Sequence, residues 1–270
     1  RGFRKRSAKH VFEEIQYQYR KGYHQFDFND DCFTLDRPRA MEILDSIINS
    51  GMKIYFQFYN GLRVDTVDPE ILQKLKKAGC FYISYGCESG NDEILKKIKK
   101  AITLKQVKDA VGWTRACGID CSVNFIIGHK DETYRTAMDS IEFGRSLPTN
   151  FVNFFNLIPY PGTEAFEWVK QNGKFLIDTN NYLEAISYAD NKPIFETKDL
   201  SKEQREKIVK IGFSIHEYRV LRYRFGRFTG TLLFYLTRNK YIKVLAARFA
   251  TMNKLGNKLA VFLSRGSYKK

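Results

Sequence analysis

Five short apolar segments recur along the first 160 residues, and their spacing constrains the fold more than any other feature of the chain. They begin at residues 23, 53, 81, 121 and 151, so successive starts lie 30, 28, 40 and 30 residues apart. Amphipathic sequence of helical period fills each interval, and strand–helix–strand units of this length build a parallel sheet or barrel. Each segment ends in a polar or glycine-containing cluster. Because ligands bind at the carboxyl ends of such strands, we expect the functional residues in these clusters.

Helical periodicity and capping residues predict the connecting helices. The clearest spans 68–79, where Asp68 is the expected N-cap and Gly79 the end. Residues 173–200 have no regular period and are expected to be irregular, and Ser201 opens a further helical region with a capping-box pattern. The remaining helices are expected at 7–21, 35–50, 91–99, 103–117, 131–147 and 164–171.

The cysteine content and the start of the chain bear on its cellular context. Five cysteines, an odd number without the spacing of a disulfide scaffold, predict a reducing, cytoplasmic location. No apolar stretch reaches the roughly 18 residues that span a bilayer. The start at Arg1 has neither an initiator methionine nor the apolar core of a signal peptide, so we expect a processed or incomplete chain.

Polar residues after the first two predicted strands are candidate ligand-binding groups. Asp30 and Asp31 suit recognition of an ammonium or hydroxyl group, or they cap the helix that follows. Arg63 offers a planar fork for a carboxylate or phosphate. The alternative for Arg63 is a surface ion pair with Asp65.

The third predicted strand ends in the most informative segment, residues 84–90, with the sequence SYGCESG. Two glycines flank an acid, and helical sequence follows directly. This pattern lets the backbone approach a ligand closely while Glu88 accepts hydrogen bonds from ribose-like hydroxyls. A capped turn with an incidental glutamate is the alternative. Asn124 and Gly128 repeat the theme at the fourth strand.

Together these segments resemble the radical S-adenosylmethionine (SAM) superfamily, in particular its cobalamin-associated branch, which includes anaerobic magnesium-protoporphyrin cyclases. The likeness extends from about residue 4 to residue 168. It implies a partial (β/α)6 TIM-like barrel without its first strand and cluster loop, followed by a helical C-terminal extension. The residues that it implies for SAM binding are Asp30 and Asp31 at the amino group, Arg63 on the next strand, Ser84, Glu88 and Ser89 in the segment near the ribose, Lys100 at the carboxylate, and Asn124 and Gly128 at the adenosine.

The chain departs from this family in its cluster loop. The family pattern Cys-x3-Cys-x2-Cys holds a 4Fe–4S cluster whose open iron binds SAM, and the likeness places these ligands upstream of Arg1. Cys117, Cys121 and Asn124 imitate the spacing, which we interpret as coincidence. We therefore expect the chain alone to be inactive.

A second departure lies at residues 128–132, which read GHKDE where the family usually has GLPGE. Replacement of the second family glycine predicts a different backbone at Asp131. His129 lies on the expected active face, and we interpret it as an exposed loop residue rather than a catalyst.

The resemblance implies an enzyme that cleaves SAM to a 5′-deoxyadenosyl radical for radical modification or methylation of an unknown substrate. It also implies a reductant such as ferredoxin or flavodoxin, and cobalamin held by a further N-terminal domain. The alternative is a degenerate, non-catalytic barrel that binds a ligand or a partner.

The basic residues of the chain are concentrated in its last quarter. Residues 201–270 contain 17 Lys and Arg against three Asp and Glu, whereas residues 1–200 contain 28 against 27. We expect a barrel core over 1–172, a connection over 173–200 and a basic helical extension over 201–270. Between 215 and 262 basic and large apolar residues alternate in helical register, which favours an interfacial helix on anionic lipid, at the inner face of the membrane. Covering a partner domain is the alternative, and nucleic acid is the least favoured partner. The same tail favours a small-molecule substrate of the lipid or tetrapyrrole class.

Overall fold

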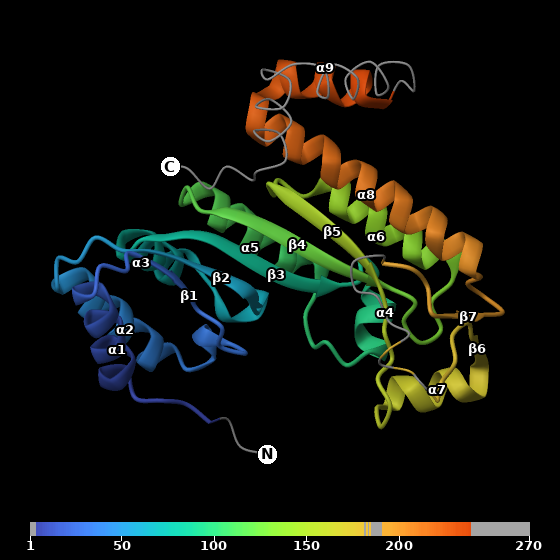
Figure 1. The fold of residues 1–270 in the computed structure, drawn as a ribbon, viewed down its shortest axis with the longest axis horizontal. Helices are drawn as coiled ribbons and strands as arrows, with labels where there is room; N and C mark the ends of the chain where they lie inside the picture. Colours follow the sequence, from blue (N-terminus) through green and yellow to red (C-terminus); the bar gives the residue numbers. More distant parts are fainter. Residues whose placement is uncertain (1–3, 181, 183, 185–190, 239–270) are drawn as a thin grey trace. The chain divides into compact units, whose positions relative to one another are not determined.

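The computed structural model describes residues 4–180, 182, 184 and 191–238 (Figure 1). These residues belong to two compact units, 1–216 and 217–270. The first unit contains the candidate functional residues. The functional division at 172 and 200 expected from the sequence stays a prediction.

The first unit is built on five parallel strands that lie side by side in chain order. The predicted parallel sheet is therefore confirmed, and its open sequential order agrees with a partial TIM-like barrel. The strands are β1 (Gln25–Asp27), β2 (Tyr55–Leu62), β3 (Cys80–Glu88), β4 (Asp120–Ile127) and β5 (Phe151–Asn156).

Helices form in every interval where the sequence predicts them, with bounds that differ by up to three residues. They are α1 (Ala8–Arg20), α2 (Arg37–Asn49), α3 (Pro69–Ala78), α4 (Asp92–Lys97), α5 (Leu104–Ala116), α6 (Tyr134–Ser146), α7 (Glu164–Asn172), α8 (Lys202–Phe225) and α9 (Arg227–Arg238), with 3-10 turns at Phe33–Leu35 and Val64–Thr66.

Local capping explains the bounds of α3 and α8. The Asp68 side chain accepts the amide hydrogen of Ile71, and Gly79 ends α3 at a φ of 110°, a left-handed conformation that glycine adopts at little cost. At α8, the amide of Ser201 donates to Gln204 at 2.9 Å and Ser201 Oγ accepts from the amide of Gln204 at 3.3 Å. Both predicted caps are confirmed.

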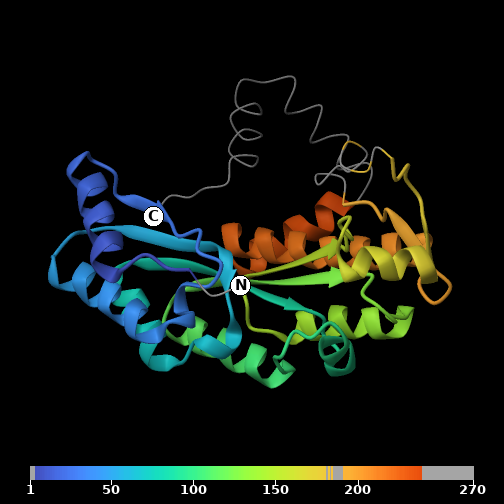
Figure 2. The ribbon, with the colours of Figure 1, turned by 90° about the horizontal axis from the view of Figure 1, so that it is seen from below.

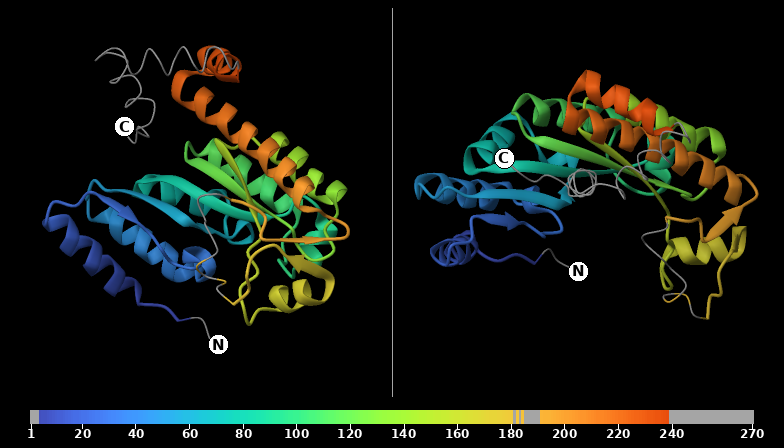
Figure 3. Two further views of the ribbon diagram at one scale, coloured as in Figure 1. Left: turned by 45° about the vertical axis from the view of Figure 1, so that its right-hand side comes forward. Right: turned by 45° about the horizontal axis from the view of Figure 1, so that its top comes forward.

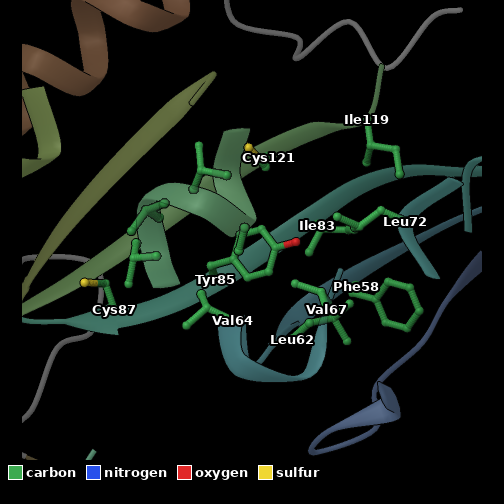
Figure 4. Packing of buried hydrophobic residues seen from close by; sticks show 14 of the residues in the cluster. Phe58, Leu62, Val64, Val67, Leu72, Ile83, Tyr85, Cys87, Ile119 and Cys121 are labelled. Carbon is green, nitrogen blue, oxygen red and sulfur yellow. The ribbon is translucent and has the colours of Figure 1, made fainter. Parts of the chain in front are cut away.

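One face of the sheet is covered by α2, α3, α5 and α6, as the view from below shows (Figure 2). Apolar side chains from this face and from the helices form one continuous core. Figure 4 shows part of it, with Ile83, Tyr85 and Cys87 along β3. Tyr85 is fully buried, and its hydroxyl is hydrogen-bonded to Thr114 of α5 at 2.7 Å, which satisfies the polar end of the ring.

The opposite face of the sheet is more polar and more exposed than the face that packs against the helices. Tyr55 and Tyr59 of β2 are 57% and 62% exposed. Hydrogen-bonded polar side chains line this face, including Ser84, Ser122 and Asn124. This face corresponds to the inside of a barrel that the described strands leave open.

Residues 173–200 are more regular than expected. Two short strands, β6 (Gly173–Phe175) and β7 (Phe195–Thr197), pair antiparallel and pack with α7 around a small second core. Each strand has only three residues, which is too short for a periodic pattern to predict it from sequence.

The first part of α8 packs along β5 at the far edge of the sheet (Figure 3). A side chain at Gly212 would overlap the ring of Phe154, so glycine allows the helix to lie close to the strand. His216 Nδ1 lies 3.0 Å from the carbonyl oxygen of Val152. Within residues 4–180, 182, 184 and 191–238, no helix is both long enough and apolar enough to cross a membrane.

Replacement of glycine by alanine should have opposite effects on stability at Gly90 and at Gly112. A Cβ at Gly90 would lie 2.5 Å from Ser140 Cα and 2.8 Å from Asp139 O, both backbone atoms of α6, whereas a Cβ at Gly112 of α5 meets nothing within 4 Å. We expect Gly90→Ala to lower the free energy of unfolding by about 1 to 3 kcal/mol. Gly112→Ala should raise it by about 0.5 to 1 kcal/mol, because alanine favours the helix. Urea unfolding of both variants tests this, and a neutral Gly90→Ala would contradict the close approach.

Candidate active site

Glu88 and Lys100 form the centre of the candidate site, at the carboxyl end of β3. Their side chains make an ion pair at 2.8 Å and are 20% and 26% exposed. The backbone of Glu88 has a φ of 72°, which is rare for a residue with a side chain and is characteristic of functional sites. A Cβ at Gly86 would lie 2.6 Å from Glu88 Oε1. Gly86 therefore provides the space in which the carboxylate lies.

The loop after Glu88 is fixed against α6. The amide of Gly90 donates to Ser140 Oγ at 2.8 Å, and Asn91 Nδ2 donates to Asp139 at 2.8 Å. Ser89 is fully buried, and its hydroxyl accepts the amide hydrogen of Asn91 at 3.2 Å. These bonds hold the loop rigid and leave the Glu88–Lys100 pair partly open to solvent.

A chain of hydrogen bonds crosses the inner face of the sheet beside this pair. Asn153 Nδ2 donates to Asn124 Oδ1 at 2.8 Å, and Asn124 Nδ2 donates to Ser84 Oγ at 2.9 Å. Ser122 Oγ also donates to Ser84 Oγ, at 3.2 Å. Gly86 lies opposite Asn124 in the strand register. The structure therefore brings Ser84 and Asn124 together, with Asn124 opposite Gly86, two residues before Glu88.

The loop at 128–132 follows β4, and two of its residues have a positive φ. Gly128 has a φ of 105° and Asp131 a φ of 57°, both in the left-handed region. Aspartate tolerates this conformation better than most residues do. The amides of Gly128 and His129 donate to Glu132 Oε2 at 2.5 and 3.3 Å. That this backbone differs from that of the family stays a prediction.

His129 is buried, so the prediction that it is an exposed loop residue is wrong. It is 8% exposed, and Nε2 has no hydrogen-bond partner among the described residues. The loop turns inward because Glu132 binds its amides. Burial lowers the pKa of His129 to about 4, although the nearby Glu88 opposes this shift. The imidazole is therefore neutral at pH 7, beside the Glu88–Lys100 pair.

Glu132 is a second buried ionisable group in this loop. It is 2% exposed, and its Oε1 has no hydrogen-bond partner in the described part of the chain. Burial raises the pKa of Glu132 to about 7, and the two backbone amides only partly offset this effect.

Arg205 packs against the loop that contains His129 and Glu132. It was not predicted from sequence, because it is one of many basic residues after Ser201. It is fully buried and donates to four oxygens: the Phe195 carbonyl at 2.7 Å, the Ile127 carbonyl at 3.1 Å, Asn156 Oδ1 at 3.1 Å and the Leu157 carbonyl at 3.5 Å. A Cβ at Gly128 would lie 2.5 Å from Arg205 Nη2. Burial lowers the pKa of Arg205 to about 10, so the guanidinium remains charged. No signal in the sequence distinguishes this arginine from its exposed neighbours.

The candidates after β1 and β2 lie outside this cluster of contacts. Asp31 is exposed, and Asp30 is 3.7 Å from Arg39. Arg63 donates twice to Asp65, at 3.0 and 2.8 Å, which is the ion pair considered as its alternative. The described structure therefore pairs Glu88 with Lys100 and Ser84 with Asn124, and it places Asn124 opposite Gly86 in the strand register. No hydrogen bond or ion pair of the described residues links Asp30, Asp31 or Arg63 to them.

The cysteines offer no cluster-binding arrangement. All five are free and lie within the described part of the chain. Among residues 4–180, 182, 184 and 191–238, no three His, Cys, Asp or Glu side chains are grouped to hold a metal ion. Burial raises the pKa of the Cys80, Cys87 and Cys121 thiols, so the thiolate that a metal needs is disfavoured.

Glu132 and His129 should change stability with pH in opposite directions. The Glu132 pKa rises from 4.5 to about 7 on folding, so its contribution is full below pH 4.5 and is lost as the pH rises through about 7. The His129 pKa falls from 6.5 to about 4, so its contribution is full above pH 6.5 and is lost as the pH falls through about 4.

The difference between each single variant and the wild type should therefore reveal the titration of the group that the variant lacks. Relative to the wild type, we expect Glu132→Gln to become more stable and His129→Leu less stable as the pH rises from 5 to 7, by up to about 3 kcal/mol for a shift of this size. Urea unfolding across this range measures the trends. Glu142→Gln, on the exposed side of α6, is the control. A Glu132→Gln protein that follows the wild-type curve would exclude a titrating carboxyl at this place.

Comparison with known proteins identifies the family. The family model of the radical SAM superfamily matches residues 1–144. An uncharacterized methyltransferase of Pyrococcus horikoshii is 32% identical over 209 residues, covering 77% of this chain and 44% of the relative. The anaerobic magnesium-protoporphyrin IX monomethyl ester cyclase of Rubrivivax gelatinosus is 25% identical over 170 residues, covering 62% of this chain and 30% of the relative. The chain thus spans less than half the length of these relatives.

Solved structures support the same fold. The radical SAM methyltransferase TsrM of Kitasatospora setae, with cobalamin and a 4Fe–4S cluster bound, superposes with a TM-score of 0.58 at 18% identity, over 65% of this chain and 37% of TsrM. The cobalamin-dependent radical SAM enzyme OxsB, with aqua-cobalamin and SAM bound, gives 0.51 at 14% identity, over 95% of this chain and 45% of OxsB. The family match supports an enzyme over the non-catalytic alternative. The chain belongs to the radical SAM superfamily, whose enzymes use SAM together with a 4Fe–4S cluster.

Proposed function

We propose that the ends of β3 and β4 bind SAM and that this chain is the core of an enzyme that methylates its substrate or modifies it by radical chemistry. The observation that carries the proposal is the Glu88–Lys100 pair, held at 2.8 Å beside a glycine that keeps the space open. Methyltransferases and cyclases among the relatives support the reaction class.

The described residues fit SAM chemically. A ribose has neighbouring hydroxyls that donate to a carboxylate, and Glu88 is an ionised acceptor at a strand end. SAM also carries a carboxylate, and the Lys100 ammonium has three donors, so that it can bind this group while remaining bonded to Glu88. Nε2 of His129, which has no hydrogen-bond partner among the described residues, is a further polar atom near Glu88 and Lys100.

When bound, SAM and a 4Fe–4S cluster would supply the radical chemistry, and the residues of this chain would bind and orient SAM. Glu88 and Lys100 fix the ribose and the amino acid end. Asn124 and the backbone at Gly128 lie along the neighbouring strand and contact the adenosine. Asp30 and Asp31 meet the SAM ammonium group after β1. Arg63 remains bonded to Asp65 and supports the loop after β2.

The cluster ligands in this proposal lie outside the described residues, as do the residues that bind cobalamin. The reductant is a ferredoxin- or flavodoxin-like protein. Relatives named as a hopanoid methylase and a bacteriochlorophyllide methyltransferase favour a lipid or tetrapyrrole substrate. The five free cysteines favour a reducing, cytoplasmic location.

Substitution of Glu88 tests the proposed site. Glu88→Gln keeps the size of the side chain and removes the charge that the ribose hydroxyls and Lys100 recognise. We expect it to weaken SAM binding about tenfold or more, in line with about 1.5 to 3 kcal/mol for a charge-assisted hydrogen bond. Equilibrium dialysis with labelled SAM under anaerobic conditions measures the dissociation constant directly.

The chain offers a closely matched control. Glu164 pairs with Lys99 at 2.9 Å, but both side chains are 75% exposed. Glu164→Gln should leave SAM affinity unchanged. The proposal fails if the wild-type protein does not bind SAM, or if the two variants lose affinity equally.

A further inference from the structure

The C-terminal unit has an unusual distribution of charge. Glu217 is the last acidic residue of the chain, and residues 218–270 contain 13 Lys and Arg without any Asp or Glu. Such a segment repels a second copy of itself. It attracts surfaces with a high density of negative charge.

One face of α9 is already used in packing against the end of α8. Phe234 and Gly230 are buried, and the rings of Phe234 and Tyr218 lie 5.1 Å apart, edge to face. A side chain at Gly230 would overlap the backbone of Leu221 and Arg222, so the two helices are in close contact. This packing fixes which face of α9 points away from α8.

The other face of α9 carries four large apolar side chains. Phe228 is 87% exposed, Leu232 58%, Tyr235 66% and Leu236 37%. At 3.6 residues per turn the four positions fall within an arc of about 100°, so they lie on the same side of the helix. Four such residues on one short helix form a continuous apolar surface rather than scattered exposed residues. This surface, Phe228, Leu232, Tyr235 and Leu236, is called the apolar face below.

We propose that the apolar face of α9 lies on an anionic lipid bilayer. Apolar and aromatic side chains on one side of a helix enter the boundary between headgroups and acyl chains, and basic residues around them bind the lipid phosphates. Arg227 and Arg238 stand at the two ends of α9, and the whole segment after Glu217 is free of acidic residues. The phosphates of a nucleic acid would bind the basic residues, but they would offer no apolar contact to Leu232 and Leu236.

The test is co-sedimentation of the protein with vesicles of phosphatidylcholine alone or mixed with phosphatidylglycerol. We expect binding to the mixed vesicles, at least tenfold weaker binding to neutral ones, and a decrease at high salt. A triple variant, Phe228→Gln, Leu232→Gln and Tyr235→Gln, keeps the basic residues and should lose at least tenfold in affinity for the mixed vesicles.

Tyr17→Gln is the matched control, because Tyr17 is a 55% exposed aromatic residue on α1. It should bind like the wild type. Failure of the wild type to bind anionic vesicles at low salt overturns the proposal. So does a triple variant that binds as well as the wild type, or a preference for duplex or single-stranded DNA over the mixed vesicles in competition. SAM binding by the same proteins is measured separately and does not depend on this outcome.

Discussion

The buried guanidinium of Arg205 joins parts of the first unit that the sheet alone leaves separate. A charge without solvent is costly unless polar groups surround it. Here the carbonyls of Ile127 and Phe195 and the side chain of Asn156 surround it, from the ends of β4 and β5 and the start of β7. Phe195 also places its ring 4.1 Å from the guanidinium. One side chain from α8 therefore fixes the carboxyl edge of the sheet where the candidate site lies.

This constraint extends to the site through Gly128. The guanidinium approaches Gly128 so closely that no side chain fits there. The same residue donates its amide to Glu132, and the next residue, His129, is turned inward next to Glu88. Three ionisable groups thus lie near one another away from water, with charges set by burial: a cation, a neutral imidazole and a carboxyl that titrates near neutrality. Disturbing any one of them changes the loop that the proposed site uses.

The fold was predictable from sequence because its information is local. Periodicity and caps such as Asp68 and Gly79 belong to single elements, and the spacing of strands follows from them. The roles of Glu88 and Lys100 at SAM follow from the family likeness and stay predictions, whereas their ion pair was not predicted. The burial of Arg205 and His129 was not predictable, because it depends on segments that are distant in sequence, such as Ile127, whose carbonyl binds Arg205 from 78 residues away. An arginine in a basic stretch also has no sequence feature that separates it from its neighbours. For Arg63 the sequence left open ligand binding or an ion pair with Asp65, and the structure contains the ion pair.

Arg205 also changes how the basic composition is read. It belongs to the basic last quarter of the chain, yet it contributes to a core and is unavailable to any external partner. The net charge of residues 201–270 therefore includes both a basic residue that stabilises the fold and basic residues that can bind an external partner. The acid-free segment begins only after Glu217, close to the point at which the chain passes from the first compact unit to the second. Up to that point a basic residue can be required by the fold, as Arg205 is. After Glu217, all charged side chains are basic, and the apolar face of α9 lies in the same segment. These two properties together favour binding to an external anionic surface.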